Sequence, residues 1–302
     1  MRLGLQLPSY TYPGGAPAIG PTLTAIAESA ESVGFASLWV MDHWIQLPEE
    51  SGWGGPDEPM LEAYTTLGFL ARATSRIALG PLVAGVHFRH PGALVKQATT
   101  LDVLSGGGRT YFGVGAGWYA REARALGFPF PERRERFDRL EETLRIATAM
   151  FAGDRSPFHG PFTTLAEPFN VPLPLSQPRP RIMVGGNGPN RTMSLVARYG
   201  DACNFLNTEP GESRQLVDTI RRHCDQIGRD PAEIETTVLM DVDLRPGRGT
   251  TAALVELARA QAGEGIDHLI INLPDAHRIE LLETIGREVI PELAAMSAPA
   301  IA

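Results

Sequence analysis

The chain has 302 residues, 43% of them apolar, and a formal net charge of -8. This length accommodates one barrel-sized domain or two ordinary ones. The acidic balance argues against a nucleic-acid or anionic-membrane surface, because either would need clustered basic residues. We therefore expect the partner to be a small molecule.

The cysteines and the N-terminus bear on the compartment. Cys203 and Cys224 are too few for a disulfide framework and lack metal-site spacing, so we expect reduced thiols and no metal site. The first residues run directly into a strand-like segment without a signal-peptide pattern, and no apolar run reaches membrane-spanning length. These features predict a cytoplasmic protein.

Strand-like and helix-like segments alternate along the whole chain. The predicted strands are 2–8, 35–41, 76–85, 110–115, 181–184, 201–205, 234–244 and 268–273. The predicted helices are 18–33, 61–74, 92–105, 132–151, one that opens at 189–191, 213–227, 250–263 and 278–293. Eight strands, each followed by a helix, predict a (β/α)8 TIM barrel, and a doubly wound open sheet is the alternative.

One segment interrupts the alternation. Residues 153–180 contain seven prolines and few periodic apolar residues. Because strand–helix units resume after it, we interpret it as an irregular excursion between the fourth and fifth strands and not as a domain linker. The chain is then a single domain over 1–302.

The unusual residues fall at the carboxyl ends of the predicted strands. They are Asp42, His43 and Trp44 after the second strand, His87 after the third, Gly115 to Trp118 after the fourth, Gly185 and Gly186 after the fifth, Asn204 after the sixth and Asn272 in the eighth. In a barrel these ends share one rim and build one active site. The barrel therefore predicts a single pocket.

A glycine-rich turn follows the fifth strand. Gly185, Gly186, Asn187 and Gly188 let the backbone approach a ligand closely. The helix behind this turn presents unpaired N–H groups to an anion, so we predict a phosphate site, with Arg191 as an added charged contact. The alternative is an ordinary turn that needs glycine only for its backbone angles.

Several motifs together resemble a known family. The segments SLWVMDHW, RIALGPLVAGVHFRHPGALVKQATTLDVLSGGGRTYFGVGAGWYAREARALGFPF, RIMVGGNGPNRT and RYGDACNF resemble the luciferase-like monooxygenase superfamily, and within it the branch that uses the deazaflavin coenzyme F420. The resemblance implies a TIM barrel with a segment inserted between strands four and five, and a homodimer. It also implies a flavin or deazaflavin ring across the strand ends, in front of a cis peptide between Leu82 and Val83.

We therefore expect specific residues around the coenzyme. The expected contacts are Asp42, Leu82, Val83, Gly115, Gly117, Trp118, Gly185, Gly186, Asn187, Gly188, Arg191 and Asn204. The deazaflavin carries an acidic tail past its phosphate, for which Arg89, Arg191, Arg133, Arg134 and Arg136 are candidate cations. Arginines on a helix are otherwise an ordinary solvated face.

His43 is the predicted catalytic residue. Histidine titrates near the working pH, and in the matching motif of F420-dependent dehydrogenases it handles the proton that accompanies hydride transfer. The alternative is a histidine that only hydrogen-bonds its loop. Asp42 is expected to orient His43 or to contact the coenzyme, and Trp44 and Trp118 to flank a ring or to pack. We assign His87 to the pocket wall and His90 to a structural role.

One position departs from the family pattern. The sugar-phosphate dehydrogenases of this branch have a glutamate directly after the fourth-strand Gly-x-Gly, where this chain has Trp118. A sugar-phosphate substrate is therefore doubtful. Glu122 lies four residues further on, at the expected first turn of a helix, where we interpret its carboxylate as favourable to the helix dipole.

These observations predict an oxidoreductase that moves a hydride between coenzyme F420 and a small organic substrate. A deazaflavin transfers hydride but reacts poorly with oxygen, so its enzyme needs a proton-handling group such as His43. Two alternatives stay open: an FMNH2-dependent monooxygenase on the same fold, with FMN as the cofactor, and a flavin-binding barrel without turnover.

Overall fold

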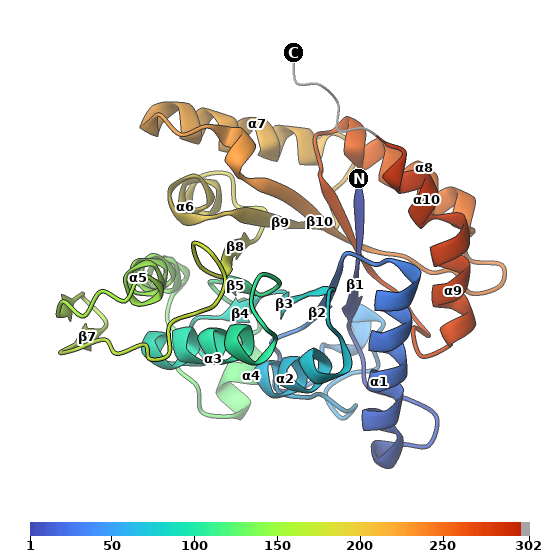
Figure 1. Cartoon of the computed structure of the whole chain (residues 1–302), viewed down its shortest axis with the longest axis horizontal. Helices are drawn as coiled ribbons and strands as arrows, with labels where there is room; N and C mark the ends of the chain where they lie inside the picture. The colour runs from blue at the N-terminus through green and yellow to red at the C-terminus, as the bar shows by residue number, and fades with distance from the viewer. Residues whose placement is uncertain (297–302) are drawn as a thin grey trace.

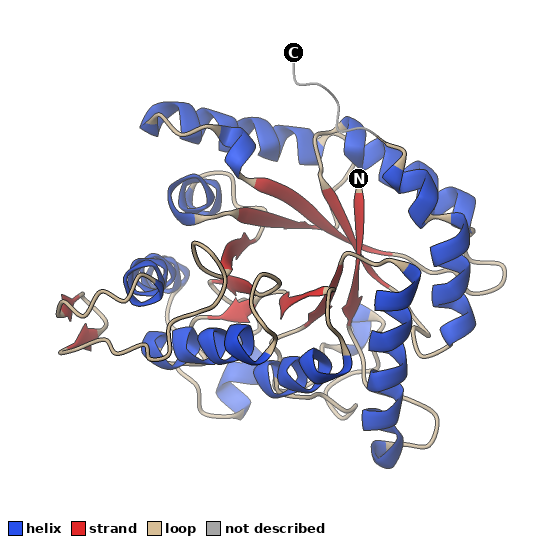
Figure 2. Cartoon of the chain, in the orientation of Figure 1, coloured by secondary structure: helices blue, strands red, loops and turns tan. Residues whose placement is uncertain are grey.

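The computed structural model describes residues 1–296 and contains a barrel of parallel strands surrounded by helices (Figures 1 and 2). The strands are β1 (Arg2–Leu7), β2 (Ser37–Val40), β3 (Ala78–Pro81), β4 (Ala84–Gly85), β5 (Tyr111–Gly115), β8 (Arg181–Gly185), β9 (Ala202–Leu206), β10 (Glu235–Asp241) and β11 (His268–Asn272). Their order in the sheet is β3-β2-β1-β11-β10-β9-β8-β5-β4. The (β/α)8 prediction is confirmed.

The ends of the sheet meet at the third predicted strand, which is split in two. The β3 segment pairs with β2, whereas β4 pairs with β5. Between them lies the Leu82–Val83 peptide bond, which is cis as predicted. Leu79 of β3 forms a parallel bridge with Thr110, and its N–H donates to the Arg109 carbonyl at 2.8 Å. The sheet therefore nearly closes on itself, which excludes the doubly wound alternative.

Helices cover the outer face of the strands (Figure 2). They are α1 (Ala16–Val33), α2 (Ala63–Ala73), α3 (Pro91–Leu104), α4 (Ala120–Ala125), α5 (Arg133–Phe151), α6 (Arg191–Tyr199), α7 (Glu212–Ile227), α8 (Thr251–Gly263), α9 (Ile279–Glu288) and α10 (Ile290–Ala294). The single helix predicted over 278–293 is wrong, because the chain breaks into α9 and α10 near Pro291, which has no N–H for a helical hydrogen bond. None of the helices in the described residues is long and apolar enough to cross a membrane.

The proline-rich segment lies beside α3 and α5. It contains one short antiparallel hairpin, β6 (Phe158–His159) with β7 (Thr164–Leu165), which extends to the left in Figure 1. The Asn170 amide donates to Thr99 Oγ1 at 3.0 Å and to the Met150 carbonyl at 3.1 Å, which ties the segment to both helices. Its status as an insertion relative to the family stays a prediction.

Apolar side chains pack on both faces of the barrel wall. The larger core lies between strands and helices, and a second cluster fills the barrel interior. That inner cluster contains Trp39, Leu82, Tyr111, Met183, Ala202, Leu239 and Ile270. The strands are therefore buried on both faces, which explains their nearly continuous apolar sequences.

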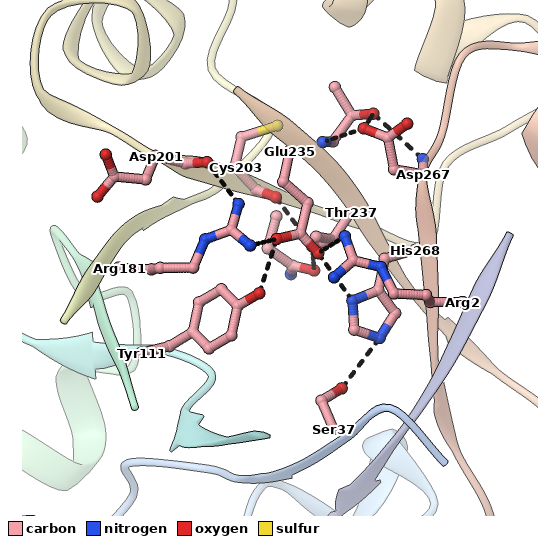
Figure 3. Close-up of polar contacts among 12 residues, drawn as sticks. Arg2, Ser37, Tyr111, Arg181, Asp201, Cys203, Glu235, Thr237, Asp267 and His268 are labelled. Carbon is pink, nitrogen blue, oxygen red and sulfur yellow. Dashed lines mark hydrogen bonds and ion pairs between the residues drawn. The ribbon is translucent and has the colours of Figure 1, made fainter. Parts of the chain in front are cut away.

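An ionic network closes the amino-terminal end of the barrel (Figure 3). Glu235, the first residue of β10, accepts hydrogen bonds from Tyr111 Oη at 2.7 Å and from His268 Nδ1 at 2.9 Å. Arg2 and Arg181 form ion pairs with the same carboxylate at 2.6 and 2.9 Å. Burial opposes the charge of Glu235, but the His268 hydrogen bond and the two arginines outweigh it and lower its pKa to about 2. This end is therefore plugged, and the opposite end is free to form a site.

Candidate active site

A cavity of about 450 Å³ lies at the carboxyl ends of the strands. Twelve of the thirteen predicted site residues line it: Asp42, His43, Leu82, Val83, Gly115, Gly117, Trp118, Gly185, Gly186, Asn187, Gly188 and Asn204. The thirteenth, Arg191, lines an adjoining groove of about 630 Å³. The strand ends thus converge on one pocket, as the barrel predicted.

The floor of the cavity is built from Val83 and two glycines. A Cβ on Gly185 would come within 2.7 Å of Val83 Cγ2, and one on Gly115 within 2.9 Å. Neither glycine has a positive φ, so glycine is not needed there for the backbone conformation. It is needed because a side chain would collide with Val83. The absent side chains of both glycines make room for the Val83 side chain against β5 and β8.

His43 is hydrogen-bonded to the buried carboxylate of Glu122. Glu122, in the short helix α4, is fully buried and its Oε2 lies 3.0 Å from His43 Nδ1. Its other oxygen accepts the backbone N–H groups of Ile45, at 3.1 Å, and of Trp44. Because Glu122 occupies Nδ1, the nitrogen left for a ligand is Nε2, which has no partner in residues 1–296.

Aromatic side chains surround the His43 imidazole. The ring of Trp118 meets it edge-on at 5.8 Å between centroids, and Tyr119 does so at 6.1 Å. Trp118 is 60% exposed and stacks on Tyr119, so it forms a rim over the cavity. Trp44 packs instead between Phe88 and Phe128 and does not line the cavity. Of the two tryptophans, only Trp118 is placed to flank a ligand.

Asp42 forms an ion pair with Arg89. Its two oxygens accept from Arg89 at 2.7 and 2.8 Å, and the Gly85 N–H donates to Oδ2 at 3.0 Å. Arg89 also pairs with Glu62 at 2.6 Å, and its side chain is buried. The expectation is that Asp42 orients His43 or contacts the coenzyme and that Arg89 reaches a coenzyme tail. These bonds occupy the Arg89 guanidinium and both Asp42 oxygens, and no hydrogen bond joins Asp42 to His43 in the described residues, so the coenzyme contact of Asp42 stays a prediction. Here Asp42 fixes β4 against the end of β2.

The glycine turn offers fewer N–H groups than predicted. The Gly186 N–H donates to the Asn204 carbonyl at 2.9 Å, because the pairing of β8 with β9 continues into the turn, so the expected phosphate contact from that N–H is not available. The Asn187 side chain exchanges two 2.9 Å hydrogen bonds with the Leu206 backbone. The N–H groups of Gly188, Arg191 and Thr192 donate to no acceptor in the described residues, whereas the Met193 and Ser194 N–H groups donate to the Gly188 and Asn190 carbonyls at 3.3 Å.

These free N–H groups face the adjoining groove, which carries positive charge. Its lining includes Gly188, Thr192 and three arginines: Arg133, Arg134 and Arg191. Arg191 is partly committed, since it donates to the Arg134 carbonyl at 3.0 Å and pairs with Asp138. Arg133 and Arg134 form no ion pair within residues 1–296. Helix N-terminus and arginines together favour an anion there.

His87 and His90 have different environments. His90 caps α3, since its Nδ1 accepts the Gly92 N–H at 3.2 Å, in agreement with the predicted structural role. His87 is only 6% exposed and lines the cavity. Burial, although opposed by the charge of Glu122, lowers the pKa of His87 to about 4, so the ring is neutral near pH 7.

Sequence reasoning missed several lining residues. Glu122 was interpreted only as favourable to a helix dipole, and its partners Trp44 and Ile45 are not visible in local spacing. The apolar lining residues Phe88, Phe137, Leu206 and Leu239 gave no signal, because they resemble core positions. No group of three or more His, Cys, Asp or Glu residues in the described part of the chain is arranged to hold a metal ion.

The comparison with known families decides the identity of this barrel. The model of the luciferase-like monooxygenase family matches residues 6–292. The chain belongs to the luciferase-like monooxygenase family. It is therefore an enzyme of a family that contains F420-dependent oxidoreductases and monooxygenases.

Relatives of both kinds resemble the chain. It is 32% identical over 219 residues to the F420-dependent glucose-6-phosphate dehydrogenase of Kineococcus radiotolerans, which covers 72% of this chain and 62% of that protein, so the chain matches less than two thirds of that relative. The F420-dependent tetrahydromethanopterin reductase of Methanopyrus kandleri superposes with a TM-score of 0.76 at 16% identity, covering 97% of this chain and 99% of that one. The EDTA monooxygenase of Chelativorans sp. BNC1 gives 0.80 at 16% identity, covering 99% and 94%. The two structures establish the shared fold.

Proposed function

We propose that this luciferase-like protein is an oxidoreductase that transfers a hydride between coenzyme F420 and a small organic substrate. The observation that carries the proposal is the His43–Glu122 pair, in which a buried carboxylate holds Nδ1 and leaves Nε2 for the substrate. The F420-dependent dehydrogenase relative supports the choice of coenzyme.

The cavity has the features that a deazaflavin needs. Val83, Gly115 and Gly185 form a floor for the ring system. The free N–H groups of Gly188, Arg191 and Thr192 suit the phosphate, and Arg133 and Arg134 suit an acidic tail in the adjoining groove. Coenzyme F420, when bound, supplies a carbon centre that accepts or donates a hydride.

The protein's own part in the reaction is to handle the proton. His43 takes the hydroxyl proton at Nε2 when an alcohol is oxidised, and returns a proton to the oxygen when a carbonyl is reduced. The Glu122 carboxylate stabilises the imidazolium that forms in the first direction and fixes the ring with Nε2 outward. Trp118 and Tyr119 shield the reacting atoms from water.

The alternative is an FMN-dependent monooxygenase, which the shared fold with EDTA monooxygenase favours. A flavin-binding barrel without turnover is less favoured, because it would have no use for the buried His43–Glu122 pair. The homodimer implied by the family resemblance stays a prediction.

Parallel titration with oxidised F420 and oxidised FMN tests the proposal. We expect the deazaflavin to bind at micromolar concentration or tighter and FMN at least about tenfold more weakly, because only F420 places acidic groups along Arg133 and Arg134. A matched variant, Arg133→Gln, should weaken F420 binding more than FMN binding. Micromolar FMN binding with no detectable F420 binding would overturn the assignment.

A further inference from the structure

The cavity wall near His43 carries hydrogen-bonding groups that the proton chemistry does not use. His87 lines this wall, and neither of its ring nitrogens has a partner in residues 1–296. Its ring lies 3.9 Å from that of Phe88 and 5.2 Å from that of Phe130. A neutral imidazole offers one donor and one acceptor, and buried polar groups of this kind are normally paired. His87 therefore points to a ligand.

Arg136 lies on the same side of the cavity. Its Nη1 donates to the Pro131 carbonyl at 2.8 Å, and its Cζ stands 4.1 Å from the ring centre of Phe130, the ring that also contacts His87. Its Nε is buried without an acceptor, and no carboxylate pairs with Arg136 among the described residues. Arg89, in contrast, is neutralised by two carboxylates. Arg136 is thus a cation of this wall that is left to bind an anion.

The proposed function places the coenzyme's anionic groups in the adjoining groove and not at Arg136. Arg136 lines the cavity but not the adjoining groove, Arg134 and Arg191 line only the groove, and Arg133 lines both. Phe137 lines both regions, as do Arg133, Gly188 and Thr192, and the Arg133 and Arg191 guanidinium groups stand 5.8 and 5.2 Å from the centre of its ring. An anion at Arg136 therefore belongs to a second molecule in the cavity.

We propose that Arg136 and His87 form the carboxylate subsite of a small hydroxy acid or oxo acid substrate. This inference rests on the proposed function and names its substrate class. The planar guanidinium suits a carboxylate, the His87 N–H adds a second donor, and Trp118, Tyr119 and Phe88 cover the apolar body. In the oxidation the carbinol C–H leaves as hydride to the bound deazaflavin and the O–H proton passes to His43. The carboxylate is unchanged.

Calorimetric titration of the F420-loaded protein with benzoate and with benzamide tests the subsite, because the two probes share a ring and differ in charge. We expect benzoate to bind the wild type at least about tenfold more tightly than benzamide. Arg136→Gln should abolish this preference, and Arg136→Lys should retain part of it. His87→Phe should weaken benzoate by about threefold or more and leave benzamide unchanged. Arg145→Gln is the matched control, since Arg145 is exposed on the same helix and lines neither the cavity nor the adjoining groove.

Two results would overturn the inference. One is equal affinity of the wild type for benzoate and benzamide. The other is benzoate binding that appears only without coenzyme and is displaced by F420, because Arg136 would then serve the coenzyme's own anion. Failure of the wild type to bind F420 would instead contradict the proposed function. The failure of the inference and the failure of the proposed function are therefore distinguishable.

Discussion

Replacing Glu122 by glutamine probes the group that prepares His43. The variant keeps the shape of the side chain, and its amide oxygen can still accept the Trp44 and Ile45 N–H groups. It removes the charge that faces His43 Nδ1 at 3.0 Å and puts an N–H₂ donor there. The ring must then accept at Nδ1 and carry its proton on Nε2, which is the wrong tautomer for taking a proton from a substrate hydroxyl.

The size of the effect follows from the lost interaction. A hydrogen bond to a charged group contributes about 1.5–3 kcal/mol, and this one is made to an imidazolium only after proton transfer. At about 1.4 kcal/mol per factor of ten, kcat for alcohol oxidation should fall by roughly ten- to a hundredfold. The Kd for F420 should change by less than about threefold, because Glu122 lies behind His43.

Steady-state kinetics from pH 5 to pH 9, with F420 affinity measured in parallel, would check this prediction. Glu280→Gln, an exposed glutamate in α9, is the matched control and should behave as the wild type. Glu122→Ala should in addition lower the melting temperature, since it leaves two backbone N–H groups without their acceptor. A Glu122→Gln enzyme with wild-type kcat at every pH would refute the positioning role.

Three further predictions concern His43, the floor of the cavity and the ionic network around Glu235. His43→Ala should lower turnover by about a hundredfold or more and keep F420 affinity within about tenfold; wild-type turnover would demote His43 to a structural residue. Gly185→Ala places a methyl 2.7 Å from Val83 Cγ2 and should weaken F420 at least about tenfold, whereas Gly263→Ala, which meets no atom within 4 Å, should not; equal titration curves would contradict this role of the floor. The lowered pKa of Glu235, about 2, means that its stabilisation is complete above pH 4.5 and is lost as the pH falls towards 2. Glu235→Gln should therefore lower the free energy of unfolding by about 3–5 kcal/mol at pH 7 and flatten its pH dependence between 4.5 and 2, measured by urea titration; an unchanged slope would show that the network is not coupled to folding.

The sequence by itself determined the barrel and the rim. Strand order along the chain, apolar strand segments and polar strand ends are local patterns, and the parallel barrel brings all strand ends to one face whatever lies between them. His43, Gly115 and Gly185 were therefore placed correctly from their positions at strand ends. The helix break near Pro291 was missed, although proline itself was the local signal.

Only the tertiary structure decided which of the polar groups at the strand ends are free to bind a ligand. Asp42 and Arg89 lie 47 residues apart and neutralise each other, and the Gly186 N–H is taken by Asn204 of the neighbouring strand. Glu122 is 79 residues from His43, yet it becomes its partner because α4 folds back over the end of β2. Hydrogen bonds and ion pairs depend on distances between side chains that are remote in sequence, so no local pattern can show whether a polar group is already satisfied.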